Sequence, residues 1–256
     1  MAKRTSLAEK YDEINDRIAA ACERAGRDRK SVALVAVTKY AAPEQVRELV
    51  RLGHQDFAEN YVQPLVQRAS QLNEFHQRRV QAGDALVAGR LRWHMIGHLQ
   101  RNKVKQTLPH VAMVQSVDSL RLAEEIDTVA EKLGIEKVPV LLQVNASEEK
   151  QKYGVAVGAA VHLGEQIDTM PHVQLMGLMT LAAYGADEAT LRQVFTRTRE
   201  VFDEMKWHKI GGEKLRHLSM GMSDDFEIAI EEGATLVRIG SALFGGELND
   251  ADDAPA

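Results

Sequence analysis

Apolar and polar positions along the chain follow two patterns, one typical of helices and one typical of buried strands. Residues 7–26 carry apolar side chains at the three- and four-residue spacing of an amphipathic helix, which Gly26 closes. Residues 32–37 instead form a continuous apolar and β-branched run, VALVAV, without polar alternation. Such a run indicates a strand buried on both faces, as in a parallel sheet.

The two patterns alternate to the end of the chain. Strand patterns occupy residues 32–37, 56–60, 92–96, 112–117, 139–145, 174–181, 216–220 and 235–240. Helical patterns lie between them at 43–53, 61–80, 99–107, 119–133, 156–169, 187–206 and 224–233. Eight strand–helix units without a break in composition favour a single α/β domain, a (β/α)8 TIM barrel. An open doubly wound sheet is the alternative, although no strand is followed by the GxGxxG of a dinucleotide site.

We expect one barrel domain over residues 1–246. The stretch 65–91 is long for one helix, and it predicts an extended helix followed by a surface loop around Gly83–Gly89. Residues 247–256 are acidic and contain a proline, which is typical of a disordered tail.

Composition narrows the class of protein. The chain has 256 residues, of which 45% are hydrophobic and 27% charged, the usual mixture of a globular protein. Its formal net charge of −5 gives no electrostatic reason to expect nucleic acid as a partner. Cys22, the single cysteine, excludes an intrachain disulfide and is expected to be a buried helix residue. Without a leader-like segment or about 18 consecutive apolar residues, we expect a cytoplasmic protein with no membrane partner.

Candidate chemistry lies where the strands end, because a TIM barrel carries its site at that edge. Lys39 follows six apolar residues at the end of the first predicted strand. Partial burial would lower the pKa of its amine and leave it nucleophilic toward an aldehyde. The alternative is a lysine that extends from the strand end into water.

The last two strands end in residues suited to an anion. Gly240 allows close approach of the backbone, and Ser241 offers N–H and O–H donors at the start of a short helix. Ser219, at the end of the preceding strand, is the neighbouring donor. Phosphate sites recur at these two loops of TIM barrels, although Gly240 and Ser241 also suit an ordinary helix cap. An amine opposite a phosphate site indicates a phosphorylated aldehyde.

No metal site is expected. His94 and His98 are four residues apart, but they lie at a strand exit around Ile96-Gly97 and not on one face of a helix. The acidic residues at 224–227 are typical of a helix start.

Seven segments in chain order carry a family resemblance: VAVTK (35–39), ENYVQ (59–63), WHMIGHLQRNK (93–103), LLQVN (141–145), GLMT (177–180), LSMGMSDD (218–225) and VRIGSALFG (237–245). They resemble the pyridoxal phosphate homeostasis protein family. The resemblance implies a fold-type III barrel that binds pyridoxal 5′-phosphate (PLP), like the N-terminal domain of alanine racemase. Ala58 and Pro64 depart from the family pattern, which usually has glycine and glutamate there.

The resemblance also implies roles for individual residues. Lys39 would hold the aldehyde of PLP as an internal aldimine. Ser219, Gly240 and Ser241 would bind the phosphate, and Arg238 would face the pyridine nitrogen. Asn60, Met220 and His94 match pocket positions of the family.

The function expected from these features is binding of PLP and its delivery to apo-enzymes by a monomeric protein without catalytic activity. An arginine can only donate to the pyridine nitrogen, so the ring would remain a poor electron sink. Alanine-racemase-like enzymes take a second base, a tyrosine, from an added β-domain for which this chain leaves no room. The alternatives are a single-domain amino-acid racemase and a lysine-dependent aldolase for a phosphosugar.

Overall fold

Eight parallel strands form a closed barrel in the structure, a computed structural model that describes residues 6–83, 89–149, 151–183 and 185–245. The barrel strands are β1 (Ala33–Val37), β2 (Asp56–Glu59), β3 (Arg92–Met95), β4 (Met113–Val117), β5 (Val138–Asn145), β7 (Val173–Met179), β8 (His217–Ser219) and β9 (Leu236–Ile239). Each strand pairs with the next, and β1 pairs with β9 to close the ring. The predicted TIM barrel is confirmed, and the open sheet is excluded.

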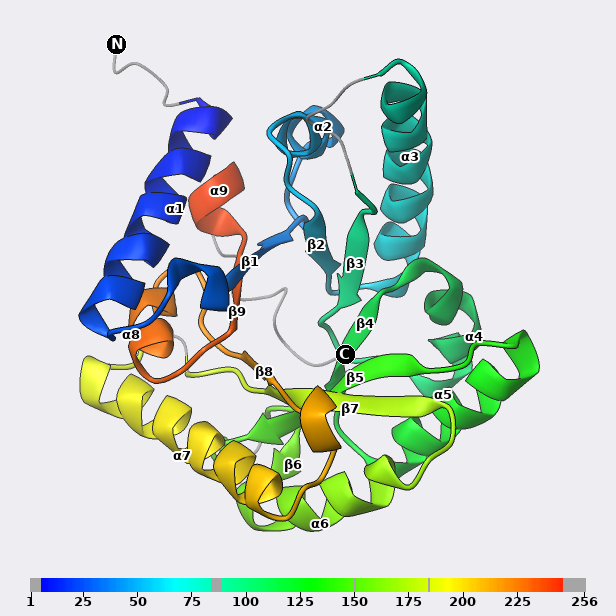
Figure 1. Ribbon diagram of the computed structural model, residues 1–256, viewed down its shortest axis with the longest axis vertical. Coiled ribbons are helices and arrows are strands. Elements are labelled where there is room, and N and C mark those ends of the chain that lie inside the picture. The colour runs from blue at the N-terminus through cyan, green and yellow to red at the C-terminus, as the bar shows by residue number, and fades with distance from the viewer. Residues whose placement is uncertain (1–5, 84–88, 150, 184, 246–256) are drawn as a thin grey trace.

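Helices surround the strands on the outside of the barrel (Figure 1). They are α1 (Leu7–Arg24), α2 (Pro43–Arg51), α3 (Val62–Gln81), α4 (Val104–Thr107), α5 (Leu120–Leu133), α6 (Val157–Asp168), α7 (Glu188–Trp207), α8 (Phe226–Glu231) and α9 (Ser241–Phe244). Short 3-10 turns occupy Arg29–Ser31, Arg101–Lys103, Leu108–His110 and Gly212–Lys214. Cys22 is buried on α1, as expected. No helix in the described ranges is both long and apolar enough to cross a membrane.

The elements differ from the prediction in two places. The helix expected at 99–107 is a single α-helical turn, α4, between two 3-10 turns. Pro109 lies in the second of these turns and has no N–H with which to continue an α-helix. The short strand β6 (Val155–Ala156), which was not predicted, pairs with the end of β5 outside the ring. The predicted loop at Gly83–Gly89 falls mostly, and the predicted tail 247–256 wholly, outside the described residues.

The buried apolar side chains form two layers. Successive residues of each barrel strand point alternately into one layer and into the other. The larger layer lies between the strands and the helices and includes Val237 and Ile239 of β9. The smaller lines the inside of the barrel, the lumen, and includes Leu236 of β9 together with Val35 and Val37 of β1. Residue 238 therefore faces the lumen, because side chains alternate along a strand.

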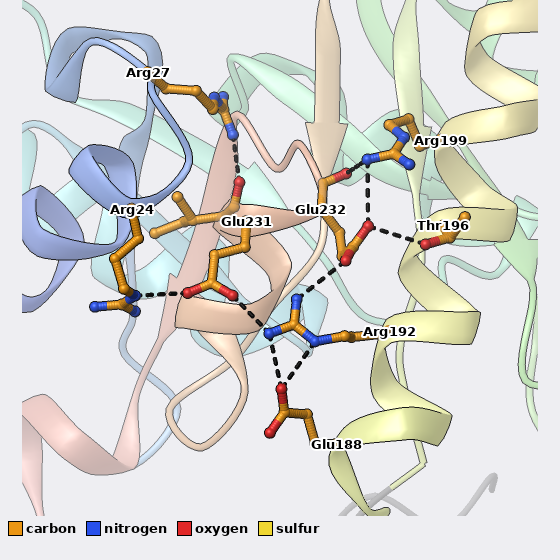
Figure 2. Close-up of polar contacts among 9 residues, drawn as sticks. Arg24, Arg27, Glu188, Arg192, Thr196, Arg199, Glu231 and Glu232 are labelled. Atoms are coloured by element: carbon orange, nitrogen blue, oxygen red, sulfur yellow. Dashed lines mark hydrogen bonds and ion pairs between the residues drawn. The ribbon is translucent and has the colours of Figure 1, made fainter.

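An ion-pair network ties the first helix to two late ones (Figure 2). Arg192 of α7 contacts Glu188 of its own helix at 2.8 Å, Glu231 of α8 at 2.7 Å and the adjacent Glu232 at 3.1 Å. Arg24 of α1 contacts Glu231 from the other side at 2.7 Å. These contacts raise the pKa of Arg192 and join α1, α7 and α8 on the side of the barrel where β1 and β9 meet.

Replacing Arg192 by glutamine is expected to lower the free energy of unfolding by about 1 kcal/mol at low salt, since three partly exposed ion pairs are lost together. At about 0.5 M salt the difference from the wild type should shrink to less than half, because screening weakens such pairs. Urea unfolding at both salt concentrations measures the effect. The matched control is Arg78→Gln, whose ion pair with Glu74 is exposed, and an equal loss in both variants would contradict the prediction.

Candidate cofactor-binding site

The barrel register brings the ends of β1, β2 and β9 to the same edge. Val37 of β1 pairs with Ala58 of β2, so Lys39 and Asn60 lie at the same level two residues later. On the other side of β1, a Cβ on Gly240 would lie 3.3 Å from the carbonyl oxygen of Val37. Lys39, Asn60 and the Gly240-Ser241 segment therefore converge at the carboxyl edge of the barrel, although Lys39 and Gly240 are far apart in sequence.

A buried carboxylate lies beside the lysine. Glu59, at the end of β2, has no exposed surface and accepts a hydrogen bond from Thr38 Oγ1 at 2.6 Å. Arg68 of α3 contacts the same oxygen, Oε1, at 3.0 Å, while Oε2 has no hydrogen-bond partner among the described residues. Burial raises the pKa of Glu59, and the Thr38 bond and the charges of Arg68 and Lys39 oppose that rise. The half-buried Lys39 amine, 4.9 Å from the Tyr40 ring centre, thus lies in the field of a negative group.

The loops after β8 and β9 are in contact and bring together Ser223, Gly240 and Ser241, a group called the polar cup below. Gly221 has φ +94°, and a Cβ there would lie 2.6 Å from that of Ala229, so only glycine fits. Ser223, 8% exposed, accepts a hydrogen bond at Oγ from the backbone N–H of Ala242 at 3.2 Å, which joins the two loops. With Gly240 and Ser241 beside it, the cup presents hydroxyl and backbone donors, as an anion site requires.

Arg238 lies in the lumen below this cup and is 2% exposed. Its Nη1 donates to Ser219 Oγ at 2.7 Å, and its Nη2 donates to the carbonyl oxygen of Thr180 at 2.9 Å. Burial lowers the pKa of Arg238 to about 10, and the charge of Asp225 opposes that shift. The guanidinium remains charged at neutral pH and can only donate hydrogen bonds.

A hydrogen-bonded chain continues from Ser219 through the lumen toward the opposite end of the barrel. Ser219 Oγ donates to Gln115 Oε1 at 2.6 Å, and Gln115 Nε2 donates to His94 Nδ1 at 2.9 Å. Asp56 is ionised and can only accept, so His94 Nε2 carries the ring proton toward Asp56 Oδ1 at 3.3 Å, and Nδ1 is the acceptor for Gln115. Arg92 closes the chain with two hydrogen bonds of 2.6 Å to Asp56. Burial favours the neutral form of Asp56, but the bonds from Arg92 and His94 hold its pKa well below the usual value.

The residues predicted from the sequence fall into three groups. Lys39, Asn60, Gly240 and Ser241 lie at the carboxyl edge, and Arg238 and Ser219 lie directly beneath them in the lumen. His94 lies deeper in the lumen and reaches the others through Gln115. Met220 is fully buried in the outer layer between strands and helices, so its side chain does not line the lumen.

Four residues at or near the site were given no role by sequence reasoning: Glu59, Gln115, Thr180 and Ser223. Gln115 could have been noticed in the sequence, because it is a polar residue in the middle of a predicted strand. In the structure all five residues of β4 are buried. His98 is turned to other partners: its Nδ1 is 2.9 Å from Asp118 Oδ2, and its ring stacks on Tyr153. Within the described part of the chain, no three metal-ligating side chains cluster.

His217 makes stability depend on pH at the lower end of the lumen. Burial, together with the charge of Arg216, lowers its pKa to about 4, and its Nδ1 is buried without a hydrogen-bond partner among the described residues. The unfolded imidazole takes up its proton near pH 6.5, so between the two values the unfolded state binds more protons. We therefore expect stability to fall as the pH drops from 6.5 toward 4.

Replacing His217 by glutamine should flatten that decline by about 1 kcal/mol, a figure reduced for the partial exposure of the ring. Urea unfolding of both proteins at several pH values gives the slopes. His162→Gln is the matched control, because the His162 side chain is 76% exposed. Equal slopes for wild type and His217→Gln would refute the assignment.

Comparison with known proteins assigns the class of this barrel. Residues 10–248 match the family model described as alanine racemase, N-terminal domain, which agrees with the closed parallel barrel. A protein of Aquifex aeolicus named pyridoxal phosphate homeostasis protein is 38% identical over 240 residues, which cover 94% of this chain and 98% of that one. The chain belongs to the pyridoxal phosphate homeostasis protein family, as the resemblance predicted.

Two solved structures extend the comparison. A structure described as an unknown protein from Bifidobacterium adolescentis has a TM-score of 0.85 and 37% identity, and the match covers 93% of this chain and 94% of that one. PipY from Synechococcus elongatus PCC7942, solved with PLP bound, has a TM-score of 0.73 and 31% identity, covering 91% of this chain and 100% of PipY. This chain thus shares its fold with both structures, and one of them, PipY, holds PLP.

Proposed function

We propose that this protein binds PLP reversibly at the carboxyl edge of its barrel, limits the free concentration of the cofactor and delivers it to apo-enzymes. The observation that carries the proposal is the convergence of Lys39 with the Gly240-Ser241 segment through the pairing of β1 with β9. The naming of the Aquifex relative and the PLP bound to PipY support it.

The residues present fit PLP, which combines an aldehyde, a phosphate and a basic pyridine ring. The aldehyde reacts reversibly with a primary amine, and the ring withdraws electrons when its nitrogen is protonated. Lys39 supplies a half-buried primary amine, and the buried carboxyl group of Glu59 lies near it. Ser223 and Ser241 would supply hydroxyl donors for the phosphate. Gly240, whose missing Cβ faces Val37, lets this segment lie close against the end of β1, which carries Lys39.

Arg238 favours a carrier over a racemase. Its pKa of about 10 keeps the guanidinium protonated at neutral pH, so it offers the pyridine nitrogen a donor but no proton. A carboxylate at that position would hold a proton on the ring instead. The protein therefore binds the cofactor at both ends while keeping the ring a weak electron sink. All of these groups come from one chain, which fits a monomeric carrier.

Transfer and trapping experiments test the proposal. Borohydride reduction of the protein incubated with PLP should attach one cofactor to the peptide that contains Lys39, as seen by mass spectrometry. Mixing the loaded protein with an apo-enzyme that requires PLP should restore that enzyme's activity and bleach the absorbance of the carrier. Absence of any trapped adduct would overturn the proposal.

Two further incubations distinguish the alternatives. Exchange of the α-proton of single-enantiomer alanine or serine in deuterated water would identify a racemase. An adduct formed with sugar phosphates and not with PLP would identify an aldolase. The carrier predicts neither result.

A further inference from the structure

Ser219 and Gln115 carry an inference that rests on the proposed function. We propose that Gln115 is a positioning residue: it holds the Ser219 hydroxyl as a hydrogen-bond acceptor for Arg238, so that Ser219 serves the ring end of PLP and not its phosphate. The family resemblance placed Ser219 at the phosphate. The hydrogen bonds of the lumen support a different role.

The hydroxyl of Ser219 has only one proton to donate. Gln115 Oε1 carries no proton, so Ser219 must donate across the 2.6 Å between them. Arg238 Nη1 can only donate, so it occupies a lone pair of the same oxygen at 2.7 Å. Ser219 and Gln115 are fully buried, so water does not take over either bond. A phosphate accepts hydrogen bonds only, and Ser219 has no second proton to give it.

The orientation of the Gln115 amide is set by His94. Its Nε2 donates to His94 Nδ1, because the proton of that ring lies on Nε2, facing Asp56. Turning the amide over would place its oxygen against the lone pair of Nδ1 and its NH2 against the Ser219 hydroxyl. Asp56 therefore fixes His94, His94 fixes Gln115, and Gln115 fixes Ser219.

The position of Arg238 depends on the Ser219 hydroxyl. Its two terminal nitrogens are held by Ser219 Oγ and by the carbonyl oxygen of Thr180. With one acceptor lost, the guanidinium keeps only the Thr180 contact and can rotate. A misplaced Arg238 guanidinium should weaken the binding of any ligand that presents a ring nitrogen to it, whether or not the ligand carries a phosphate.

Ser223 offers the matching contrast in the phosphate cup. Its hydroxyl oxygen accepts from the N–H of Ala242, which leaves the hydroxyl proton for an acceptor outside the protein. Removal of the Ser223 hydroxyl should therefore affect only ligands that carry a phosphate.

The experiment measures the affinities of the full chain for PLP, for pyridoxal without phosphate and for inorganic phosphate. Ser219→Ala and Gln115→Met should each weaken the binding of PLP and of pyridoxal by the same factor, about tenfold for one buried hydrogen bond. The double variant should also lose about tenfold and not about a hundredfold, because both changes break one chain. Affinity for inorganic phosphate should not change. Ser223→Ala should weaken PLP and phosphate and leave pyridoxal unaffected.

A second variant and a ligand-free measurement separate positioning from structural damage. Gln115→Glu keeps the acceptor for Ser219, so it should bind pyridoxal more tightly than Gln115→Met, although it buries a charge. In nitrogen NMR of the unliganded wild type, His94 should carry its proton on Nε2. In Gln115→Glu, Nδ1 should also become protonated, because a carboxylate cannot donate to it.

Three results would overturn the inference: multiplied losses in the double variant, loss of phosphate binding in Ser219→Ala, or a wild-type His94 protonated on Nδ1. Should Gln115→Met fail to fold, the Gln115→Glu affinities and the wild-type NMR still decide the matter. A wild type that binds neither PLP nor pyridoxal would refute the proposed function itself.

Discussion

Lys39→Ala is expected to lose all covalent attachment of PLP and to weaken its binding at least about 100-fold, since the effectively intramolecular reaction with the amine is lost. The remaining polar cup and Arg238 would still hold the cofactor without a bond to it. Loss of the visible absorbance and of the borohydride-trapped adduct, read by spectrophotometry and mass spectrometry, measures the effect.

Two control variants sharpen that test. Lys39→Arg keeps a positive charge beside Glu59 but has no amine that reacts with an aldehyde, so it should fail in the same way. Lys105→Ala, on an exposed position of α4, should bind like the wild type. An undiminished adduct in Lys39→Ala would place the reactive amine elsewhere.

Gly177→Ala should unfold the barrel or cost more than about 3 kcal/mol of stability. Gly177 has φ +152°, and a Cβ there would lie 1.8 Å from the carbonyl oxygen of His217 on the neighbouring strand β8. That oxygen belongs to the backbone of a barrel strand, so it cannot move aside without breaking the pairing of β7 with β8. Circular dichroism and urea unfolding measure the loss.

Gly158→Ala is the matched control for that substitution. Gly158 lies in α6, and nothing lies within 4 Å of the Cβ that alanine would add. Alanine has the higher helix propensity, so this variant should gain about 0.5–1 kcal/mol. Similar stabilities for the two variants would contradict the steric argument.

The barrel was predictable because its strands are buried on both faces. Runs such as 32–37 and 139–145 lack alternation and are bounded by helical patterns, and the observed strands β1 and β5 begin and end within one residue of them. The two-residue strand β6 escaped because its pairing depends on the neighbouring end of β5 and not on its own sequence.

The edge of the site was predictable for a related reason. In a TIM barrel, the residue that follows a strand lies at the carboxyl edge, which places Lys39 and Ser241 without any coordinates. The lumen chain was not predictable, because alternation tells which side chains face inward but not which of them meet. Gln115 and Ser219 are 104 residues apart, and only closure of the ring brings their side chains within 2.6 Å.

Because β1 pairs with β9, a ligand bound between them would connect the first and last strands of the barrel. Lys39 is synthesised about 200 residues before the Gly240-Ser241 segment, so a growing chain cannot capture cofactor until its last strand has emerged and docked. A ligand that touches both strands stabilises only the closed ring, by about 2.7 kcal/mol at a concentration 100 times its Kd. If PLP bridges the two strands as proposed, the protein without its cofactor would have a lower free energy of unfolding and a ring that opens more readily between β1 and β9.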